Sequence, residues 1–270
     1  MNELDEIRTI IEESKLKYKN YQVWDLASTE NFNLEQAVSE LPFNIGKGVW
    51  KGILLNDDVK LNLGGKHALT SANVLCINSS DVIHNFRISL IGPDVLEISK
   101  KTVDFAMMVL IGGKKIEKSV LNKLKRTIYL SNEIDGLSLR SISRKFWYQI
   151  SNILYDKQVS FKHIGIAFIA LYLQEFEDII ESIEVVFIID DEDAILKLID
   201  LEPKIKKIYS EAFKDKIWKY AKQRDDCDFD WECAVCDYQS ICNEIRNIIK
   251  LRENKITKLK DKNEDISGCR

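Results

Sequence analysis

The chain has 270 residues, of which 45% are hydrophobic and 30% charged, and its formal net charge is −4. This size and composition are ordinary for a globular protein with a substantial core. Because there is no basic excess, we do not expect nucleic acid as a partner. No apolar run approaches the roughly 20 residues of a membrane-spanning helix, and the acidic start of the chain is unlike a targeting segment. We therefore expect a cytoplasmic protein without membrane contact.

The first segment, residues 1–42, is expected to be a helical lead-in. Apolar residues recur at helical spacing over residues 3–18. A second, short helix is predicted to begin at Asn33, because Asn33-Leu-Glu-Gln36 has the form of a capping box. Pro42 is expected to end this helix.

The rest of the sequence predicts a mixed α/β (α+β) domain over residues 43–250, in which a sheet of mixed strands is flanked by helices. The C-terminal segment of this domain is expected to be held by a metal. Glycines and short β-branched runs favour sheet up to about residue 113, after which helical spacing returns. Residues 251–270 are highly charged, and we expect a disordered tail. The expected strands are 59–63, 73–77, 86–91, 104–111 and 183–189. The expected helices are 117–130, 139–154, 164–180, one that opens with the acidic residues 190–193 and runs to about 201, 204–222 and one that begins at 243.

A group of four cysteines suggests a metal centre. Cys227, Cys233, Cys236 and Cys242 have the spacing C-x5-C-x2-C-x5-C. A reducing cytosol disfavours disulfides, and a C-x2-C pair directs two thiolates to one centre from a single turn. Four thiolates satisfy either a tetrahedral zinc ion or a [4Fe–4S] cluster. Structural zinc sites usually pair two C-x2-C knuckles, and only one is present here. Iron–sulfur is therefore favoured, with zinc as the alternative.

The end of this group, C-x2-C-x-Tyr-x3-C, also resembles iron–sulfur nucleases of the RecB and Cas4 type, in which a [4Fe–4S] cluster staples the end of the domain. Such a nuclease needs a metal-binding carboxylate followed by Glu-x-Lys on a neighbouring strand. Asp190 and Glu202-Pro-Lys204 have nearly this spacing. However, the segment between them reads as helix, and Pro203 is unsuited to a central strand. The nuclease is the least favoured hypothesis.

A cationic segment offers a second candidate site. Arg140, Arg144 and Lys145 lie beside Trp147 and Tyr148. Arginine forks bind phosphates through paired hydrogen bonds, so this segment can contact an anionic group such as a CoA phosphate, or a protein partner. The alternative is a solvated helix face with an aromatic anchor.

Two smaller features also have functional and structural interpretations. The pair Gly64-Gly65 could allow a ligand to approach the backbone, although such pairs are more often turns. His163, at the start of an expected apolar helix, could carry a proton or bind a ligand, although a histidine at this position is more often structural.

The order of segments from Phe43 to Cys242 resembles the cluster-bearing domain of acetyl-CoA synthase, the β subunit of the acetyl-CoA decarbonylase/synthase complex. The resemblance extends over most of the chain and depends on the order of its stretches. These are Gly48-Val-Trp-Lys-Gly52, Val59-Lys-Leu-Asn-Leu-Gly-Gly65, Ile91-Gly-Pro-Asp94, Val109-Leu-Ile-Gly-Gly113, Phe146-Trp-Tyr-Gln-Ile-Ser151, His163-Ile-Gly165 and Ile183-Glu-Val-Val-Phe-Ile-Ile-Asp190.

In that family a C-x2-C and a later third cysteine help to bind a [4Fe–4S] cluster, so the resemblance implies this role for Cys233, Cys236 and Cys242, although the last spacing is shorter here. The family's fourth cysteine lies downstream and has no counterpart, and we assign its place to Cys227. The family's Cys-Gly-Cys, which holds a two-nickel unit, does not occur.

We therefore expect an iron–sulfur protein without the nickel site. It would be an accessory protein or diverged enzyme of an anaerobic, cytosolic pathway, with another protein of that pathway as partner and CoA or an acyl group as a candidate ligand. The alternative is a non-catalytic interaction module in which zinc or iron–sulfur is structural.

Overall fold

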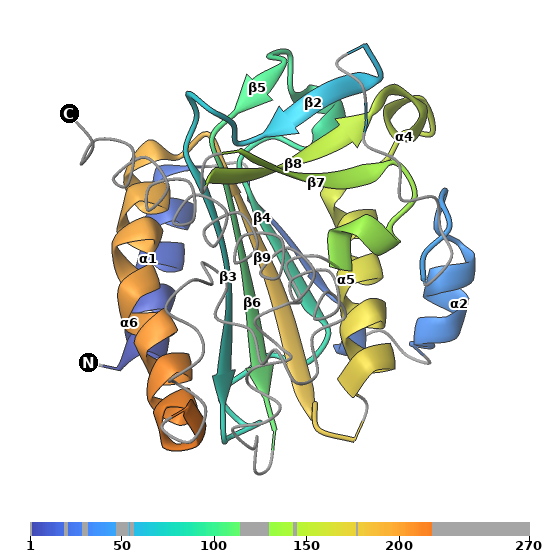
Figure 1. The fold of residues 1–270 in the computed structure, drawn as a ribbon. Coiled ribbons are helices and arrows are strands. Elements are labelled where there is room, and N and C mark those ends of the chain that lie inside the picture. The colour runs from blue at the N-terminus through green and yellow to red at the C-terminus, as the bar shows by residue number, and fades with distance from the viewer. Residues whose placement is uncertain are drawn as a thin grey trace, which may run out of the picture. The chain divides into compact units, whose positions relative to one another are not determined.

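The computed structural model describes residues 2–18, 21–28, 32–46, 54, 57–113, 130–142, 145–176 and 178–217, with only the backbone at 142 and 206–217. Nearly all of these residues belong to the unit Met1–Asp215. This unit has mixed α/β architecture, with two sheets flanked by helices, as the sequence predicts (Figure 1).

The larger sheet has five strands in the order β1-β4-β9-β6-β3. Strand β9 runs parallel to β4 and antiparallel to β6, while β3 is parallel to β6 and β1 is antiparallel to β4. Every residue of β6 and β9 is buried, which explains why their sequences are nearly continuous apolar runs. The strands are β1 (Tyr21–Asp25), β3 (Thr70–Ile77), β4 (Arg87–Ile91), β6 (Phe105–Gly112) and β9 (Ser182–Ile189).

The smaller sheet has four strands in the order β5-β2-β8-β7 and lies across one end of the larger sheet in Figure 1. Strands β7 and β8 are antiparallel neighbours, β8 pairs with β2, and β2 runs parallel to the two-residue strand β5. The strands are β2 (Val59–Leu63), β5 (Thr102–Val103), β7 (Leu137–Ile142) and β8 (Lys145–Ser151).

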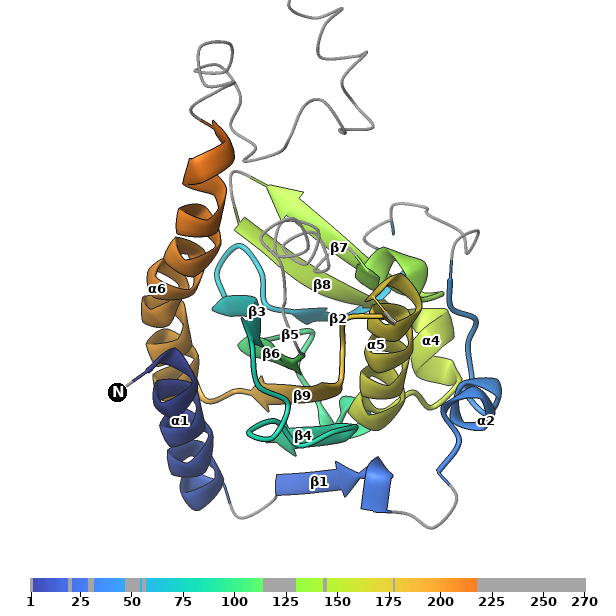
Figure 2. The same ribbon diagram turned by 90° about the horizontal axis from the view of Figure 1, so that it is seen from below.

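Helices α1 (Glu3–Lys17) and α6 (Glu192–Ile217) lie side by side on one face of the larger sheet (Figure 2). Their apolar residues form one core layer with alternate residues of β6 and β9. Ion pairs join their outer edges, Lys197 with Glu13 at 2.6 Å and Lys204 with Glu6 at 2.8 Å.

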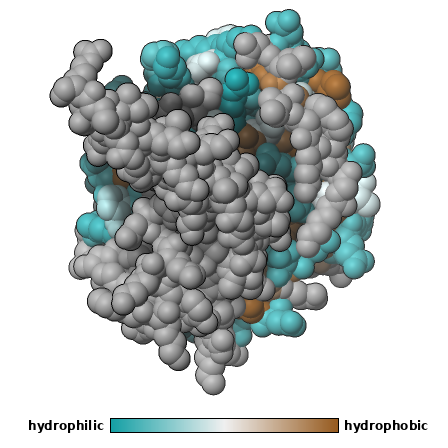
Figure 3. Space-filling model, viewed as in Figure 1, coloured by the Kyte–Doolittle hydropathy of each residue, from teal (hydrophilic) through white to brown (hydrophobic). Residues whose placement is uncertain are grey.

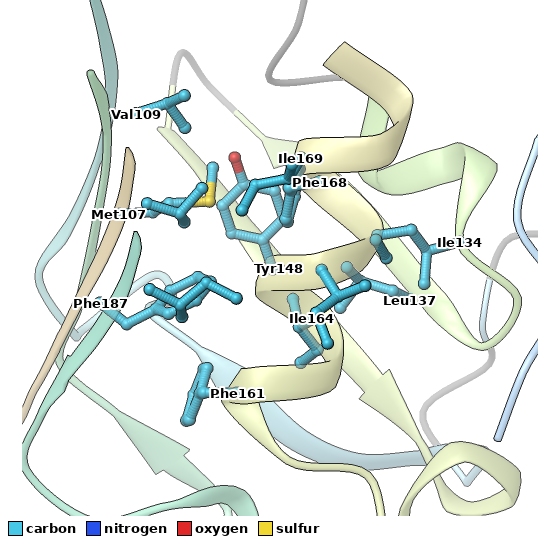
Figure 4. Packing of buried hydrophobic residues seen from close by; sticks show 14 of the residues in the cluster. Met107, Val109, Ile134, Leu137, Tyr148, Phe161, Ile164, Phe168, Ile169 and Phe187 are labelled. Atoms are coloured by element: carbon cyan, nitrogen blue, oxygen red, sulfur yellow. The ribbon is translucent and has the colours of Figure 1, made fainter. Parts of the chain in front are cut away.

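The opposite face packs against α5 (Phe161–Phe176) and against the smaller sheet. Aromatic rings fill this layer, and Figure 4 shows Tyr148, Phe161 and Phe187 within it. Between ring centroids, Phe105 lies 5.6 Å from Tyr148, and Phe161 lies 5.0 Å from Phe187. The shorter elements are η1 (Leu26–Ser28), α2 (Leu34–Ser39), η2 (Val95–Glu97) and α4 (Asn152–Asp156). In the view of Figure 3 the surface that is coloured by hydropathy is mostly hydrophilic, with small hydrophobic patches.

Several predicted elements are confirmed. Helix α1 matches residues 3–18, and the side chain of Asn33 caps α2 by accepting hydrogen bonds from the backbone of Glu35 and Gln36. Strand β2 has the predicted bounds, and β3, β4, β6, β9 and α5 differ from the prediction by a few residues at their ends. The expected helices at 117–130 and from 243, and the tail at 251–270, lie almost wholly outside the described residues.

Three local predictions are wrong. The expected helix at 139–154 is the β7–β8 pair followed by the short helix α4. Strand β1, within the expected helical lead-in, pairs with β4. Helix α6 continues through Pro203, where two helices were expected. Among the helices that the structure describes, none is long and apolar enough to cross a membrane.

Candidate functional site

A cleft of about 750 Å³ lies where the smaller sheet meets the ends of β6 and β9. Its floor is the face of β2 and β8 that points away from the aromatic core. The turn after β2 and the segment before β5 form its walls. The residues that line it are Val59, Asn62, Gly65, Lys66, His67, Ala68, Lys100, Lys101, Thr102, Asp104, Arg140, Trp147, Gln149 and Asp190.

The floor of the cleft is a fixed polar network. The Asn62 side-chain oxygen accepts two hydrogen bonds, from the indole Nε1 of Trp147 at 3.2 Å and from Nε2 of Gln149 at 2.9 Å. Asn62 on β2 lies directly opposite Gln149 on β8. Both donors are buried, at 7% and 4% exposure. Since an unpaired buried donor is costly, this network holds the floor in one arrangement.

Four of the fourteen residues that line the cleft are cationic, and two are anionic. Arg140 is the cross-strand partner of Trp147, and Lys66 and Lys101 stand on the walls. Within the described part of the chain, no carboxylate pairs with any of these three cations. Lys100 differs, because its ammonium lies 3.0 Å from Asp190, and this hydrogen bond raises the pKa of Lys100. Unpaired cations gathered in a hollow favour an anionic ligand.

Two aspartates, Asp104 and Asp190, also line the cleft. Asp190 has a left-handed backbone (φ 55°) immediately after β9, a conformation that non-glycine residues seldom adopt. Four contacts hold it there. Its carboxylate accepts from Lys100 and from the backbone N–H of Asp104, its own N–H donates to the Asp104 carbonyl, and its carbonyl accepts from Tyr18 at 2.6 Å. These contacts join the end of β9 to the start of β6 and to the end of α1, so they fix this wall of the cleft.

The cationic segment predicted from sequence lies on this cleft only in part. Arg140 and Trp147 line it. Lys145 is close by and donates to the backbone oxygen of Lys66 at 3.3 Å. Tyr148 points to the other face and is buried in the aromatic core, because successive residues of a strand face opposite sides. Arg144 lies outside the described residues.

The cysteines Cys227, Cys233, Cys236 and Cys242 all lie outside the described residues, so the predicted metal centre stays a prediction. Within the described ranges, no three histidine, cysteine, aspartate or glutamate side chains are grouped so that they could hold a metal ion.

The residues considered for a nuclease do not take the arrangement that a nuclease needs. Glu202 and Lys204 lie on a helix, α6, and not on a strand beside Asp190. The Glu202 carboxylate accepts from Ser71 at 3.0 Å, and Lys204 pairs with Glu6.

Gly64 and His163 have structural roles, whereas Gly65 lines the cleft. Gly64 has φ +86°, and a Cβ placed there would overlap the side chain of Thr70, so this position needs glycine for its backbone conformation and for the close approach of Thr70. His163 caps the start of α5, where its Nδ1 accepts from the backbone N–H of Ser160 at 3.2 Å. Burial, and next the charge of Lys162, lowers the pKa of His163.

Sequence reasoning did not find most of the residues of the cleft. Asn62, Gln149, Lys66 and Lys101 are single polar residues with no motif of their own. The stretches that resemble acetyl-CoA synthase could have indicated the cleft. Three of them, 59–65, 146–151 and 183–190, contribute residues to its lining.

The sequence pattern of the CO dehydrogenase/acetyl-CoA synthase complex beta subunit family matches residues 42–194, more than half of the chain. The chain therefore belongs to this family. The matched residues include every residue that lines the cleft.

Individual relatives are similar at low identity. The acetyl-CoA decarbonylase/synthase complex subunit beta of Methanopyrus kandleri is 26% identical over 158 residues, which is 58% of this chain and 34% of the relative. The carbon monoxide dehydrogenase/acetyl-CoA synthase subunit alpha of Moorella thermoacetica is 24% identical over 77% of this chain and 28% of its own length. The acetyl-CoA decarbonylase/synthase complex subunit beta 1 of Methanocaldococcus jannaschii is 26% identical over 84% of this chain and 27% of its own length. The chain thus spans about a third of these relatives or less.

Proposed function

We propose that this chain is an accessory or diverged member of the acetyl-CoA synthase family that binds CoA or an acyl-CoA in the cationic cleft. The observation that carries the proposal is the group of three cations around a fixed polar floor, Lys66, Lys101 and Arg140, which have no carboxylate partner among the residues that the structure describes. A guanidinium fork suits a phosphate group, and lysines add point charges beside it. The relatives are named as subunits of an acetyl-CoA complex, which supports CoA as the ligand.

Isothermal titration calorimetry of CoA against the purified chain tests this proposal. Arg140→Ala should weaken CoA binding about tenfold or more, because a charge-assisted hydrogen bond contributes about 1.5 to 3 kcal/mol. Lys157→Ala is the matched control, since Lys157 is exposed and does not line the cleft. Binding should also weaken as salt is added. Absence of CoA binding at low salt, or equal effects of the two substitutions, would contradict the proposal.

The second part of the proposal is a [4Fe–4S] cluster held by Cys227, Cys233, Cys236 and Cys242, structural or active in electron transfer, with zinc as the alternative. Its support is the cysteine spacing and membership of the family. The 270 residues contain no Cys-Gly-Cys, so the proposal assigns no nickel chemistry to them.

Iron and zinc analysis of protein purified without oxygen separates the two metals, and electron paramagnetic resonance after dithionite reduction identifies a redox-active cluster. Cys236→Ser should lower the metal content, whereas Cys76→Ser should not. A colourless zinc protein would remove the electron-transfer role.

A non-catalytic interaction module is the second candidate function. It is favoured by the fact that the relatives are named as subunits of complexes, and its partner would be another protein of the same pathway. This candidate predicts no CoA binding, so the titration above separates the two.

A further inference from the structure

One edge of the larger sheet is open. Strand β1 is the outermost strand on that side, and Figure 2 shows it beyond β4. The N–H of Leu26, just after β1, donates to the carbonyl of Phe86 at 3.1 Å. Because successive residues of a strand direct their backbone groups to alternate edges, those of Tyr21, Val23 and Asp25 point away from β4. Among the residues that the structure describes, no strand pairs with this outer edge.

The side chains of β1 do not protect this edge. Tyr21 is 49% exposed and Val23 is 41% exposed, and Leu16 near the end of α1 is 85% exposed. Edge strands are commonly protected by a lysine, a proline or a bulge. Strand β1 contains no lysine or proline, its only charged residue is Asp25, and its register with β4 is regular. Such an edge favours the addition of another strand.

We propose that β1 pairs with β1 of a second copy of this chain, antiparallel and centred on Val23, so that the two larger sheets become one. In this register Val23 lies opposite Val23 of the second copy, and Tyr21 lies opposite Asp25. The outward N–H and C=O groups of these three residues then all have partners. Their side chains lie on the same face of the strand, because residues at intervals of two share a face, so the exposed tyrosines and valines of both copies meet.

The charges on this face favour a second copy as the partner. The ammonium of Lys15 lies 5.8 Å from the centre of the Tyr21 ring and pairs with Glu12 at 2.8 Å. At the other end of β1, Asp25 pairs with Arg87 at 2.6 Å. The antiparallel register brings Lys15 of one copy beside Asp25 of the other, so the signs of the four charges alternate across the interface. A parallel register would place Asp25 against Asp25, and like charges directly opposite each other are unfavourable.

Sedimentation velocity of the full chain over a range of concentrations tests the proposal. The wild type should form a dimer, as expected for a two-fold, self-complementary contact. Val23→Lys should raise the Kd of the dimer about tenfold or more, because it places two ammonium groups opposite each other. Lys15→Glu should also raise the Kd, since it brings a carboxylate beside Asp25. Ile153→Lys is the matched control, because Ile153 is 68% exposed on α4, which contacts the smaller sheet. Circular dichroism checks the fold of each variant.

Amide hydrogen exchange then locates the contact. The amides of Val23 and Asp25 should exchange more slowly as the protein concentration rises, whereas those of β7, the edge strand of the smaller sheet, should not change. A wild-type chain that is monomeric at every concentration would overturn the proposal. A dimer that Val23→Lys and Ile153→Lys weaken equally, or one without added protection in β1, would overturn it too, because the contact would then lie elsewhere.

Discussion

Arg8 on α1 and Glu184 on β9 form a two-pronged ion pair, with 2.7 Å between Nη2 and Oε2 and 2.9 Å between Nη1 and Oε1. Glu184 is only 2% exposed, within the apolar layer between the sheet and α1. The paired hydrogen bonds satisfy both carboxylate oxygens. The N-terminal helix is thus joined to the centre of the sheet by charge as well as by packing.

Replacing Arg8 with methionine should destabilise the protein by about 3 kcal/mol, because Glu184 would remain buried without its partner. The double variant Arg8→Met/Glu184→Leu should recover part of this loss, since it removes both charges. Urea unfolding followed by circular dichroism measures both. A loss below about 1 kcal/mol for Arg8→Met, the range of an exposed pair, would contradict this account.

Gly64 and Gly46 provide a matched pair for a second prediction. Both have positive φ, +86° and +110°, but a Cβ at Gly64 would overlap Thr70, whereas nothing lies within 4 Å of a Cβ at Gly46. Gly46→Ala should therefore cost only backbone strain, about 1 kcal/mol. Gly64→Ala should cost at least about 1 kcal/mol more, because Thr70 must also move. Thermal unfolding that ranks the two variants in the opposite order would exclude this explanation.

The wrong and missed elements show what local sequence can predict. Residues 139–154 carry apolar side chains at spacings that allow either helix or strand. The strand is favoured because Tyr148 and Ile150 then face the aromatic core while Trp147 and Gln149 face the cleft. That choice depends on the pairing of β8 with β2, some 85 residues earlier in the chain, as in the Trp147–Asn62 bond. Local periodicity could not decide it.

The cleft was harder to predict than the fold, because it too depends on contacts between residues that are distant in the sequence. Its cations come from three separate segments, around Lys66, Lys101 and Arg140, which only the order of the strands brings together. Arg140 was identified because it has aromatic neighbours in sequence. Lys66 and Lys101 have no such neighbours, and they resemble ordinary surface lysines until the chain is folded.

Asp191 predicts a stability change in acid. Burial opposes its ionisation, but hydrogen bonds from Lys17 at 2.8 Å and Ser14 at 2.5 Å outweigh burial and lower the pKa of Asp191 below 3.8. The stabilisation is therefore complete above the unfolded pKa and is lost as pH falls through the lower, folded value. Asp191→Asn should lower the free energy of unfolding by about 2 kcal/mol at pH 7. Below pH 3.8 the same substitution should lower the free energy of unfolding by a smaller amount. Urea unfolding at a series of pH values measures this difference. A constant difference would contradict the role of the charge.

The protonation of His163 should also change the stability of the protein, at a higher pH than that of Asp191. Its Nδ1 accepts from Ser160, so the cap of α5 needs the neutral imidazole, and burial lowers the pKa of His163. The unfolded chain takes up the proton near 6.5, so stability should fall as pH drops below that value. His163→Gln should reduce this pH dependence, while the exposed His67→Gln should preserve it. Equal pH profiles for wild type and His163→Gln would show that the cap does not depend on protonation.

Asn62 predicts how the floor of the cleft contributes to both stability and binding. Asn62→Leu removes the oxygen that accepts from Trp147 and Gln149, and leaves two buried donors without a partner. Each unsatisfied donor costs about 1 to 3 kcal/mol, so the variant should be about 2 kcal/mol or more less stable. Asn62→Asp keeps an acceptor and should fold nearly as well, but its negative charge near Arg140 should weaken the binding of CoA. Urea unfolding and calorimetry on the two variants separate the effects. If Asn62→Asp binds CoA as tightly as wild type, the cations of the cleft are not the phosphate site.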